Sequence, residues 1–258
     1  MADENVLQDG RHRRVVRIGD TVRRPVQPWT PAVHALLRHL EDVGFPYAPR
    51  VKGIDGQGRD VLTYVEGESG PKGWAGVVDD AGLMAFARLL PAYHDAVTGF
   101  RLPEGLRWWT GESGPDGEGE DVVCHGDFGP WNLVWRDGAP VGVLDRDYAR
   151  PSPRLFDVAY ALEYVAPFRD DAECLRWLRY PEPPDRRRRL EVFAMAYGLT
   201  STRGLVDAVI DVQAESVEQV RRLAVAGNQP HRDWVAEGHL DELAARVAWS
   251  RAHRRLFE

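Results

Sequence analysis

Three polar side chains near the middle of the sequence have the residue types that phosphate chemistry requires. Asp127 and Asn132 lie on a loop that follows the apolar pair Val122-Val123. A predicted hairpin then returns the chain, so that Asp145 emerges beside the same loop. Carboxylate and amide oxygens are the ligands that Mg²⁺ takes, and a carboxylate can orient and deprotonate an attacking hydroxyl. The pattern therefore indicates metal-assisted phosphoryl transfer.

The residues before this segment predict a small sheet packed on one helix. Strand-forming runs at 13–18, 21–24, 50–54 and 61–65 are separated by turn residues, and Asp9-Gly10 marks a first hairpin. The helix is predicted over 31–43, with Thr30 as its N-cap and Gly44 after its end. Its expected buried face consists of Val33, Leu36, Leu37 and Leu40.

The remainder of the chain predicts mainly helices. An amphipathic helix is expected over 80–98, a hairpin over 133–144, and further helices at 157–166, 185–199, 203–224 and 239–256. The run Arg186 to Arg189 is interpreted as a solvated helix face. Taken together, the pattern predicts an α+β protein with a small N-terminal β-sheet lobe, residues 1–66, and a larger, mainly helical C-terminal lobe, residues 67–258.

The composition excludes several classes of protein. A net charge of −7 argues against a nucleic-acid partner, because such binding depends on neutralising phosphates. The two cysteines have no CxxC spacing, which argues against a zinc site and favours a reducing cytoplasm. No apolar run approaches the about 20 residues that a membrane span needs, so no membrane partner is expected.

The central segment resembles a known family. The run His125-x-Asp127-x-x-x-x-Asn132, followed by a hairpin and Leu144-Asp145, is similar to the catalytic and metal motifs of the aminoglycoside phosphotransferase and choline kinase family, relatives of the protein kinases. Asp157, in the sequence FDVAY, matches a further aspartate of that family. The resemblance implies a two-lobed protein-kinase-like fold and an enzyme that transfers phosphate from ATP or GTP to a small-molecule hydroxyl.

The resemblance also implies a role for each matching residue. Asp127 would be the catalytic base, and Asn132 and Asp145 would hold Mg²⁺ against the nucleotide phosphates. His125 would brace the loop through hydrogen bonds. Asp157 would have a structural role, capping loop or helix amides.

On the nucleotide side, the resemblance makes residues 1–66 the nucleotide-binding lobe. The phosphate loop would be 8–11, with Gly10 as its glycine. Val22 would cover one face of the base, and the amides near Tyr64 and Val65 would bind its edge. The family carries a phosphate-binding lysine on the strand that corresponds to residues 21–24. This sequence has no lysine there, and Arg24 is the candidate for the phosphate-binding cation. Arginine neutralises phosphate through a planar fork, which differs from a compact ammonium. The alternative is that Arg23 and Arg24 form an exposed basic pair.

Two further features stay open at this point. The helix 31–43 has no glutamate where the family pairs one with the lysine, so either that ion pair is absent or another residue supplies it. Asp147 is interpreted either as a second metal ligand or as an exposed partner of Arg150.

The acceptor is expected near the C-terminal helices. The candidate residues are Tyr160, Glu163 and Tyr164, since acidic and aromatic groups suit aminated acceptors. The alternative for the two tyrosines, one helical turn apart, is simple packing. Two rival functions remain: a metabolite kinase rather than an antibiotic kinase, and a pseudokinase-like nucleotide-binding or regulatory module without transferase activity.

Overall fold

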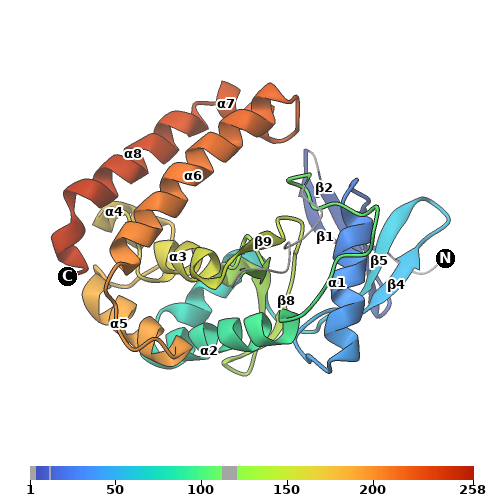
Figure 1. Ribbon diagram of the computed structural model, residues 1–258, viewed down its shortest axis with the longest axis horizontal. Helices are drawn as coiled ribbons and strands as arrows, with labels where there is room; N and C mark the ends of the chain where they lie inside the picture. Colours follow the sequence, from blue (N-terminus) through green and yellow to red (C-terminus); the bar gives the residue numbers. More distant parts are fainter. Residues whose placement is uncertain (1–3, 12, 112–120) are drawn as a thin grey trace. The chain divides into compact units, whose positions relative to one another are not determined.

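The computed structural model describes residues 4–11, 13–111 and 121–258. Figure 1 shows the helices and strands of the chain. They form two compact units, each assembled from separate stretches of sequence. The first unit contains Met1–Gly73, Ala92–Asp127 and Trp131–Arg154, and the second contains Trp74–Pro91, Phe128–Pro130 and Leu155–Glu258. Every strand among the described residues belongs to the first unit. The functional division of the chain at residue 66 stays a prediction.

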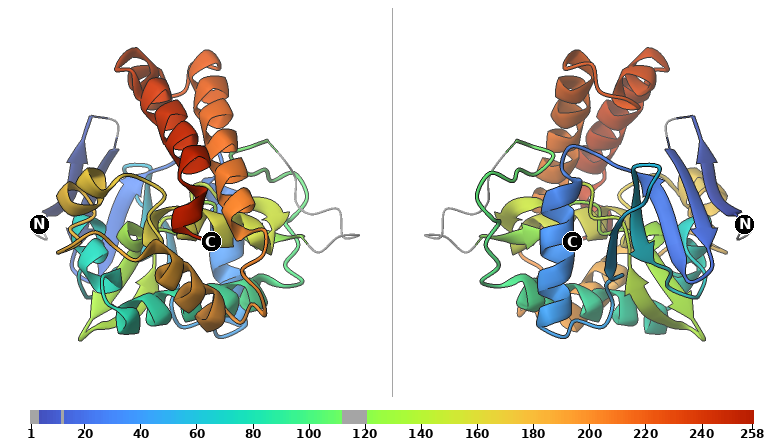
Figure 2. Two further views of the ribbon diagram at one scale, coloured as in Figure 1. Left: turned by 90° about the vertical axis from the view of Figure 1, so that its left-hand side faces the viewer. Right: turned by 90° about the vertical axis from the view of Figure 1, so that its right-hand side faces the viewer.

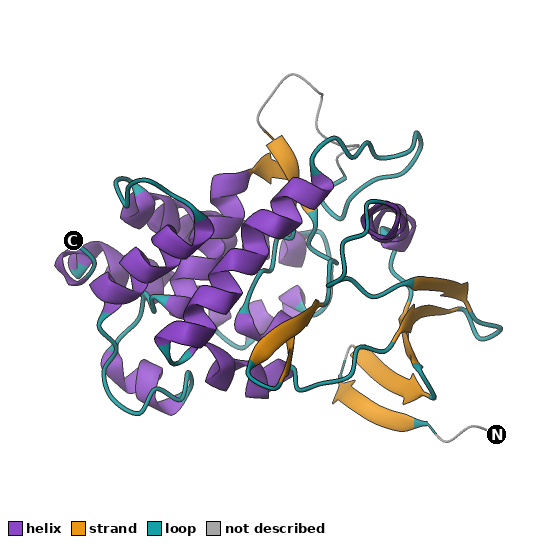
Figure 3. Cartoon of the chain, turned by 90° about the horizontal axis from the view of Figure 1, so that it is seen from below, coloured by secondary structure: helices purple, strands orange, loops and turns teal. Residues whose placement is uncertain are grey.

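A five-stranded antiparallel sheet forms the N-terminal part of the first unit, in the order β1-β2-β3-β5-β4. The strand-forming runs and tight turns of the sequence predicted these strands. Their observed bounds are β1 Asn5–Gly10, β2 Arg13–Ile18, β3 Thr21–Pro25, β4 Val51–Ile54 and β5 Arg59–Thr63. Figure 3 draws the strands in orange and the helices in purple.

Helix α1, Thr30–Asp42, belongs to the same unit and buries one apolar face. The predicted residues Val33, Leu36, Leu37 and Leu40 are all buried, as their spacing required. Thr30 is the first helical residue rather than the N-cap, because its hydroxyl accepts a hydrogen bond from the amide of Gln27 and closes the preceding turn.

Two short strand pairs complete the first unit. The predicted hairpin consists of β7, Leu133–Arg136, and β8, Ala139–Val143. Strand β6, Asp121–Cys124, pairs with β9, Arg150–Pro153. The sequence did not predict β9, because its two prolines lower strand propensity and cannot donate ladder hydrogen bonds.

The second unit is mainly helical, so the predicted α+β class is confirmed. Helix α2, Asp80–Val97, contributes residues to both units. Helices α6 and α8 of the second unit lie side by side in Figures 1 and 2. The other bounds are α3 Arg154–Val165, α4 Asp171–Arg176, α5 Arg186–Tyr197, α6 Leu205–Val225, α7 His231–Ala236 and α8 His239–Ala252. No helix of the described part is both long and apolar enough to cross a bilayer.

The interpretation of 186–189 as a solvated face was wrong for half of the run. Arg186 and Arg189 are buried, and three-residue spacing places them on one side of α5. Arg189 donates to the carbonyl of Val165 at the end of α3, and Arg186 donates to the carbonyl of Pro167 just beyond it. Arg189 thus satisfies a carbonyl group at the end of α3, where the helix offers no partner, and Arg186 satisfies one in the segment that follows.

Candidate active site

The loop after β6 begins with His125-Gly126-Asp127, and its shape requires glycine in the middle. Gly126 has φ of 80°, and a Cβ placed on it would overlap the backbone carbonyl of Tyr148. The backbone of this loop at Gly126 therefore lies directly against the backbone at Tyr148, in the segment that follows Asp145.

Gly126→Ala is expected to destabilise the protein through this overlap. Gly99 is a matched control, because it has φ of 81° but no atom near its Cβ position. Both alanines bear the cost of a left-handed backbone, and Gly126→Ala adds steric overlap. Its free energy of unfolding in urea should therefore fall by about 2 kcal/mol more than that of Gly99→Ala. Equal losses would show that the close approach to Tyr148 relaxes without cost.

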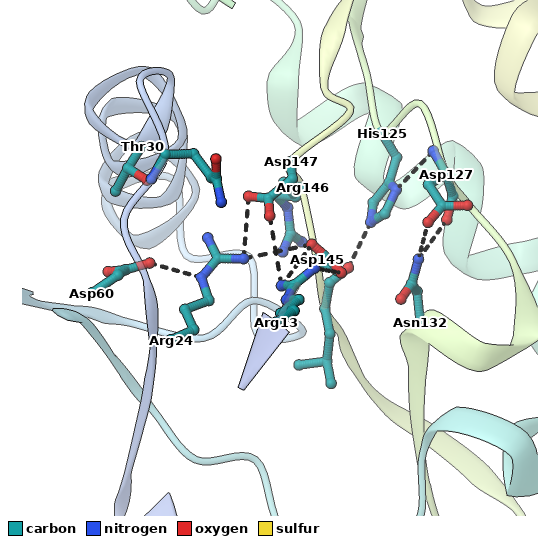
Figure 4. Close-up of polar contacts among 12 residues, drawn as sticks. Arg13, Arg24, Thr30, Asp60, His125, Asp127, Asn132, Asp145, Arg146 and Asp147 are labelled. Atoms are coloured by element: carbon teal, nitrogen blue, oxygen red, sulfur yellow. Dashed lines mark hydrogen bonds and ion pairs between the residues drawn. The ribbon is translucent and has the colours of Figure 1, made fainter. Parts of the chain in front are cut away.

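The carboxylate of Asp127 is held by two neighbouring side chains, of which Figure 4 shows Asn132. The Nδ2 atom of Asn132 donates to the Asp127 backbone oxygen at 2.9 Å and to its Oδ2 atom at 2.8 Å. The Nε1 atom of Trp131 donates to the same Oδ2 atom at 3.4 Å. These bonds set the orientation of the Asp127 side chain. The Trp131 contact could not be predicted from the sequence, because it depends on the short 3₁₀ turn over Pro130–Asn132.

His125 joins this loop to the strand that precedes Asp145. The ring is fully buried, and its Nε2 atom donates to the Leu144 carbonyl at 2.8 Å. Its Nδ1 atom accepts from the backbone N–H of Asp127 at 3.3 Å, which requires the neutral tautomer with the proton on Nε2. The amide of Leu144 donates in turn to the Asn132 carbonyl at 2.7 Å. The structure thus brings Asp127, Asn132 and the segment carrying Asp145 together.

Asp145 faces two arginines that come from neighbouring strands of the sheet (Figure 4). Nη1 and Nη2 of Arg13 lie 2.8 and 3.3 Å from its two carboxylate oxygens. Nη1 of Arg24 lies 3.5 Å from Oδ1 of Asp145 and 3.2 Å from Oδ1 of Asp147. Asp145 itself has φ of 56°, a conformation that aspartate tolerates better than most residues. Asp147 therefore belongs to this cluster, and Arg13 is a member that the sequence did not single out.

Arg24 is fixed from its other side by Asp60. The two residues are directly opposite each other on β3 and β5, and the Nε atom of Arg24 lies 2.7 Å from Oδ2 of Asp60. The other oxygen of Asp60 accepts from Nε2 of His34 on α1 at 2.7 Å. All three side chains are buried, so Arg24 is not part of an exposed basic pair. Asp60, from a strand rather than the helix, supplies the anion that pairs with the cation.

The charges of this cluster shift the pKa values of its members. Burial alone would lower the pKa of Arg24, but Asp147, Asp145 and Asp60 hold it above its ordinary value. Burial would raise the pKa of Asp145, yet Arg13 and Arg24 hold it below its ordinary value. Burial and the neighbouring charge of Asp145 raise the pKa of Asp147. Asp145 is therefore the more firmly ionised of the two carboxylates.

The donor set of this cluster fits a hard divalent cation. One nitrogen of Arg24 already lies within 3.5 Å of a carboxylate oxygen from both Asp145 and Asp147, so both residues face a single positive group. Asn132 adds an amide oxygen from the adjoining loop, because its Nδ2 atom is turned toward Asp127. Oxygen ligands of this kind suit Mg²⁺.

The remaining residues predicted for the nucleotide lie on the same unit. Gly10 is opposite Arg13 in the β1–β2 ladder, and Val22 is opposite Leu62 in the β3–β5 ladder. The amide of Tyr64 donates to the Asp20 carbonyl at 2.8 Å, and the guanidinium of Arg17 lies 3.8 Å above the Tyr64 ring. Val65 lies close to β8, since a Cβ on Gly142 would be 2.9 Å from its Cγ1 atom.

The residues predicted for the acceptor lie on α3 in the second unit. The rings of Tyr160 and Tyr164 are in contact, with centroids 5.4 Å apart. Glu163 is buried, and its Oε1 atom lies 3.4 Å from Arg169 and 3.7 Å from Arg246. Both arginines line a cavity of about 700 Å³. The charge of Glu163 is thus compensated inside the protein.

Asp157, named from the sequence, and Trp177 lie in the same unit. Asp157 is fully buried in the first turn of α3. Trp177 lines the cavity beside α4 with 62% of its surface exposed.

Comparisons with known proteins identify relatives of this chain. The chain is 35% identical over 233 residues to the trifolitoxin immunity protein of Rhizobium leguminosarum bv. trifolii, which covers 87% of each chain. The profile of the phosphotransferase enzyme family matches residues 100–192.

Solved structures show the same fold. The GDP complex of wild-type aminoglycoside 2'-phosphotransferase-IIIa matches with a TM-score of 0.61 and 16% identity, over 96% of this chain and 93% of that one. Amicoumacin kinase hAmiN, in complex with AMP-PNP, Ca²⁺ and Ami, matches with a TM-score of 0.61 and 12% identity, over 97% and 88%. The predicted protein-kinase-like fold is therefore confirmed. By its profile match over residues 100–192 and its identity to a relative over most of its length, the chain belongs to the phosphotransferase enzyme family of small-molecule kinases.

Proposed function

We propose that the protein transfers the γ-phosphate of ATP or GTP to a hydroxyl of a small molecule. The observation that carries this proposal is the position of Asp127. Asn132 and Trp131 orient its carboxylate, and His125 ties its loop to the segment that bears Asp145. A base held beside a cation-binding carboxylate is the arrangement that direct phosphoryl transfer needs.

In the proposed reaction, Asp127 accepts the proton of the acceptor hydroxyl as its oxygen attacks the γ-phosphorus. The bond between the γ-phosphorus and the bridging oxygen breaks, and the nucleoside diphosphate leaves with that oxygen. Mg²⁺, bound by Asp145 and Asn132, would neutralise phosphate charge. Asp147 is the further oxygen donor in this position. No phosphoenzyme is required, because the acceptor oxygen attacks directly.

For the nucleotide, we assign the phosphates to Arg24 and to the turn at Gly10. The buried contact of Arg24 with Asp60, which His34 holds in turn, supports this assignment. It fixes the guanidinium in the position where the family has a lysine. Val22 would pack on the base. The N–H of Tyr64 already donates to Asp20, so the contact with the edge of the base falls to Val65. Because the proposed reaction consumes ATP or GTP, we also propose a cytoplasmic location, where these nucleotides are supplied.

For the acceptor, we propose an antibacterial toxin that carries a hydroxyl group. The relative with 35% identity is named as an immunity protein against trifolitoxin, which supports a protective role. Two solved neighbours are kinases of antibiotics by name, and a metabolite kinase is the rival within the same chemistry. Tyr160 and Tyr164 remain the proposed contacts. Glu163 would act through Arg169, which lines the cavity of its unit.

A regulatory nucleotide-binding module is the second candidate function. The replacement of the usual lysine by Arg24 favours it, as does the occupation of Asp145 by two guanidiniums. Retention of Asp127, Asn132 and Asp145 opposes it, because a module without transferase activity has no chemical need for a base beside a metal site.

A thermal-shift titration with ATP and GTP, with and without Mg²⁺, tests the proposed function. A ligand at 100 times its dissociation constant stabilises the native state by about 2.7 kcal/mol, which raises the melting temperature. We expect a metal-dependent rise for the wild type and its loss in Asp145→Asn. Asp137→Asn, on the turn between β7 and β8, changes charge equally and should retain it. A wild type that shows no rise with either nucleotide would contradict the proposal.

A further inference from the structure

Arg13 is paired with the carboxylate of Asp145, the group that would bind the proposed metal ion. Its fork meets both oxygens of Asp145, at 2.8 and 3.3 Å, and its Nη2 atom lies 3.5 Å from Asp147. A divalent cation on Asp145 needs the same oxygen lone pairs. Arg13 and a bound metal ion therefore compete for one carboxylate.

The two arginines of the cluster differ in how firmly they are held. Arg24 is buried and bonded through Nε to Asp60, which His34 holds in turn. Among the described residues, the partners of Arg13 are Asp145 and Asp147, and its side chain is 30% exposed. Arg13 is therefore the arginine that can leave Asp145 without abandoning a buried anion.

The position of Arg13 on the sheet indicates where its guanidinium goes. It begins β2 directly opposite Gly10, the glycine of the proposed phosphate loop. A guanidinium released there lies beside that loop, and its planar fork matches phosphate oxygens. We infer that Arg13 is a second phosphate-binding residue, which pairs with Asp145 until nucleotide and metal arrive together. This inference rests on the proposed function.

Charge balance gives the physical reason for such an exchange. Arg13 and Arg24 neutralise Asp145 and Asp147, so a divalent cation that enters alone meets two positive groups already in place. A nucleoside triphosphate brings more negative charge than one divalent cation cancels, and it offers Arg13 a new anionic partner. The exchange makes metal binding depend on the nucleotide.

The test compares Arg13→Gln with Arg14→Gln, which removes the same charge from the exposed neighbouring position of β2. Mn²⁺ alone serves as the probe of the carboxylate site, because it prefers the same oxygen ligands as Mg²⁺. Its dissociation constant is measured by electron paramagnetic resonance. Calorimetry then gives the dissociation constants of AMP-PNP and GMP-PNP in the presence of Mg²⁺. Melting temperatures of all variants verify that the fold is retained.

Arg13→Gln should change the two affinities in opposite directions. Mn²⁺ alone should bind about tenfold more tightly, because Asp145 has lost its competing cation. The nucleotide analogue that binds the wild type should bind about tenfold more weakly, because a charge-assisted contact to phosphate is gone. Arg14→Gln should change neither. Arg13→Lys, which keeps the charge but loses the fork, should fall between the wild type and Arg13→Gln in both measurements.

Several results would overturn the inference. If Arg13→Gln weakens both ligands or leaves both unchanged, Arg13 does not exchange partners. If it tightens both, Arg13 competes with the metal but does not bind phosphate. A wild type that binds neither analogue would refute the proposed function and the phosphate contact. The Mn²⁺ comparison would still decide the competition at Asp145, so the two failures are distinguishable.

Discussion

Asp127→Asn is expected to lower the turnover number by about 10²–10⁴-fold, the usual contribution of a general base. Asparagine keeps the shape of the side chain and can still accept the hydrogen bonds of Asn132 and Trp131, so the loop should hold its conformation. It cannot take up the proton of the acceptor hydroxyl. Nucleotide affinity and melting temperature should therefore stay near those of the wild type while turnover falls.

Steady-state phosphate transfer to an identified acceptor gives the measurement. ATP or GTP hydrolysis can replace it while the acceptor is unknown, since water is then the attacking group. Asp121→Asn is a matched control, because Asp121 is exposed on β6 and loses the same charge. If Asp127→Asn kept about the wild-type turnover, Asp127 would have no role as the base.

Asp60→Asn is expected to produce the largest loss of stability. Asp60 is fully buried between Arg24 and His34, and its removal as an anion leaves a buried guanidinium with less compensation. Breaking one side of a buried ion pair costs about 3–5 kcal/mol, and the remaining carboxylates of Asp145 and Asp147 favour the lower end, about 3 kcal/mol. Urea unfolding at neutral pH measures this difference.

The pH dependence of that difference provides a second check. Burial alone would raise the pKa of Asp60, but the hydrogen bond from His34 and the charge of Arg24 hold it below its ordinary value of 3.8. A lowered folded-state pKa adds stability above the unfolded-state value, and this stability is lost as pH falls below about 4. The difference in free energy of unfolding between the wild type and Asp60→Asn should therefore decrease only below about pH 4.

Asp20→Asn is the control for this measurement, because Asp20 lies in an exposed turn of the same sheet. It should unfold at nearly the wild-type urea concentration. A loss of stability in Asp60→Asn no larger than in this control would mean that Asp60 does not hold Arg24. The assignment of the strand aspartate as the partner of the phosphate-binding cation would then be wrong.

Most elements of the fold could be predicted from the sequence, because their signals are local. The apolar spacing of α1 and the alternation of the N-terminal strands are properties of a few consecutive residues. The short helices α4 and α7 were missed, since six residues are too few to establish a helical period. Strand β9 was missed because its prolines obscure a pairing that β6 imposes from a distance.

The sequence by itself determined the family and the segment from His125 to Asp145, because loop, hairpin and polar residues follow one another within a short stretch. Only the tertiary structure decided what surrounds Arg24 and Asp145. Asp60, His34 and Arg13 come from three separate elements, and they meet through the register of β3 on β5 and the packing of α1. Such meetings depend on long-range backbone pairing, which leaves no mark in the spacing of neighbouring residues. The burial of Arg186 and Arg189 was also hidden, because their carbonyl partners, 19 and 24 residues earlier in the chain, belong to another segment that folds against α5.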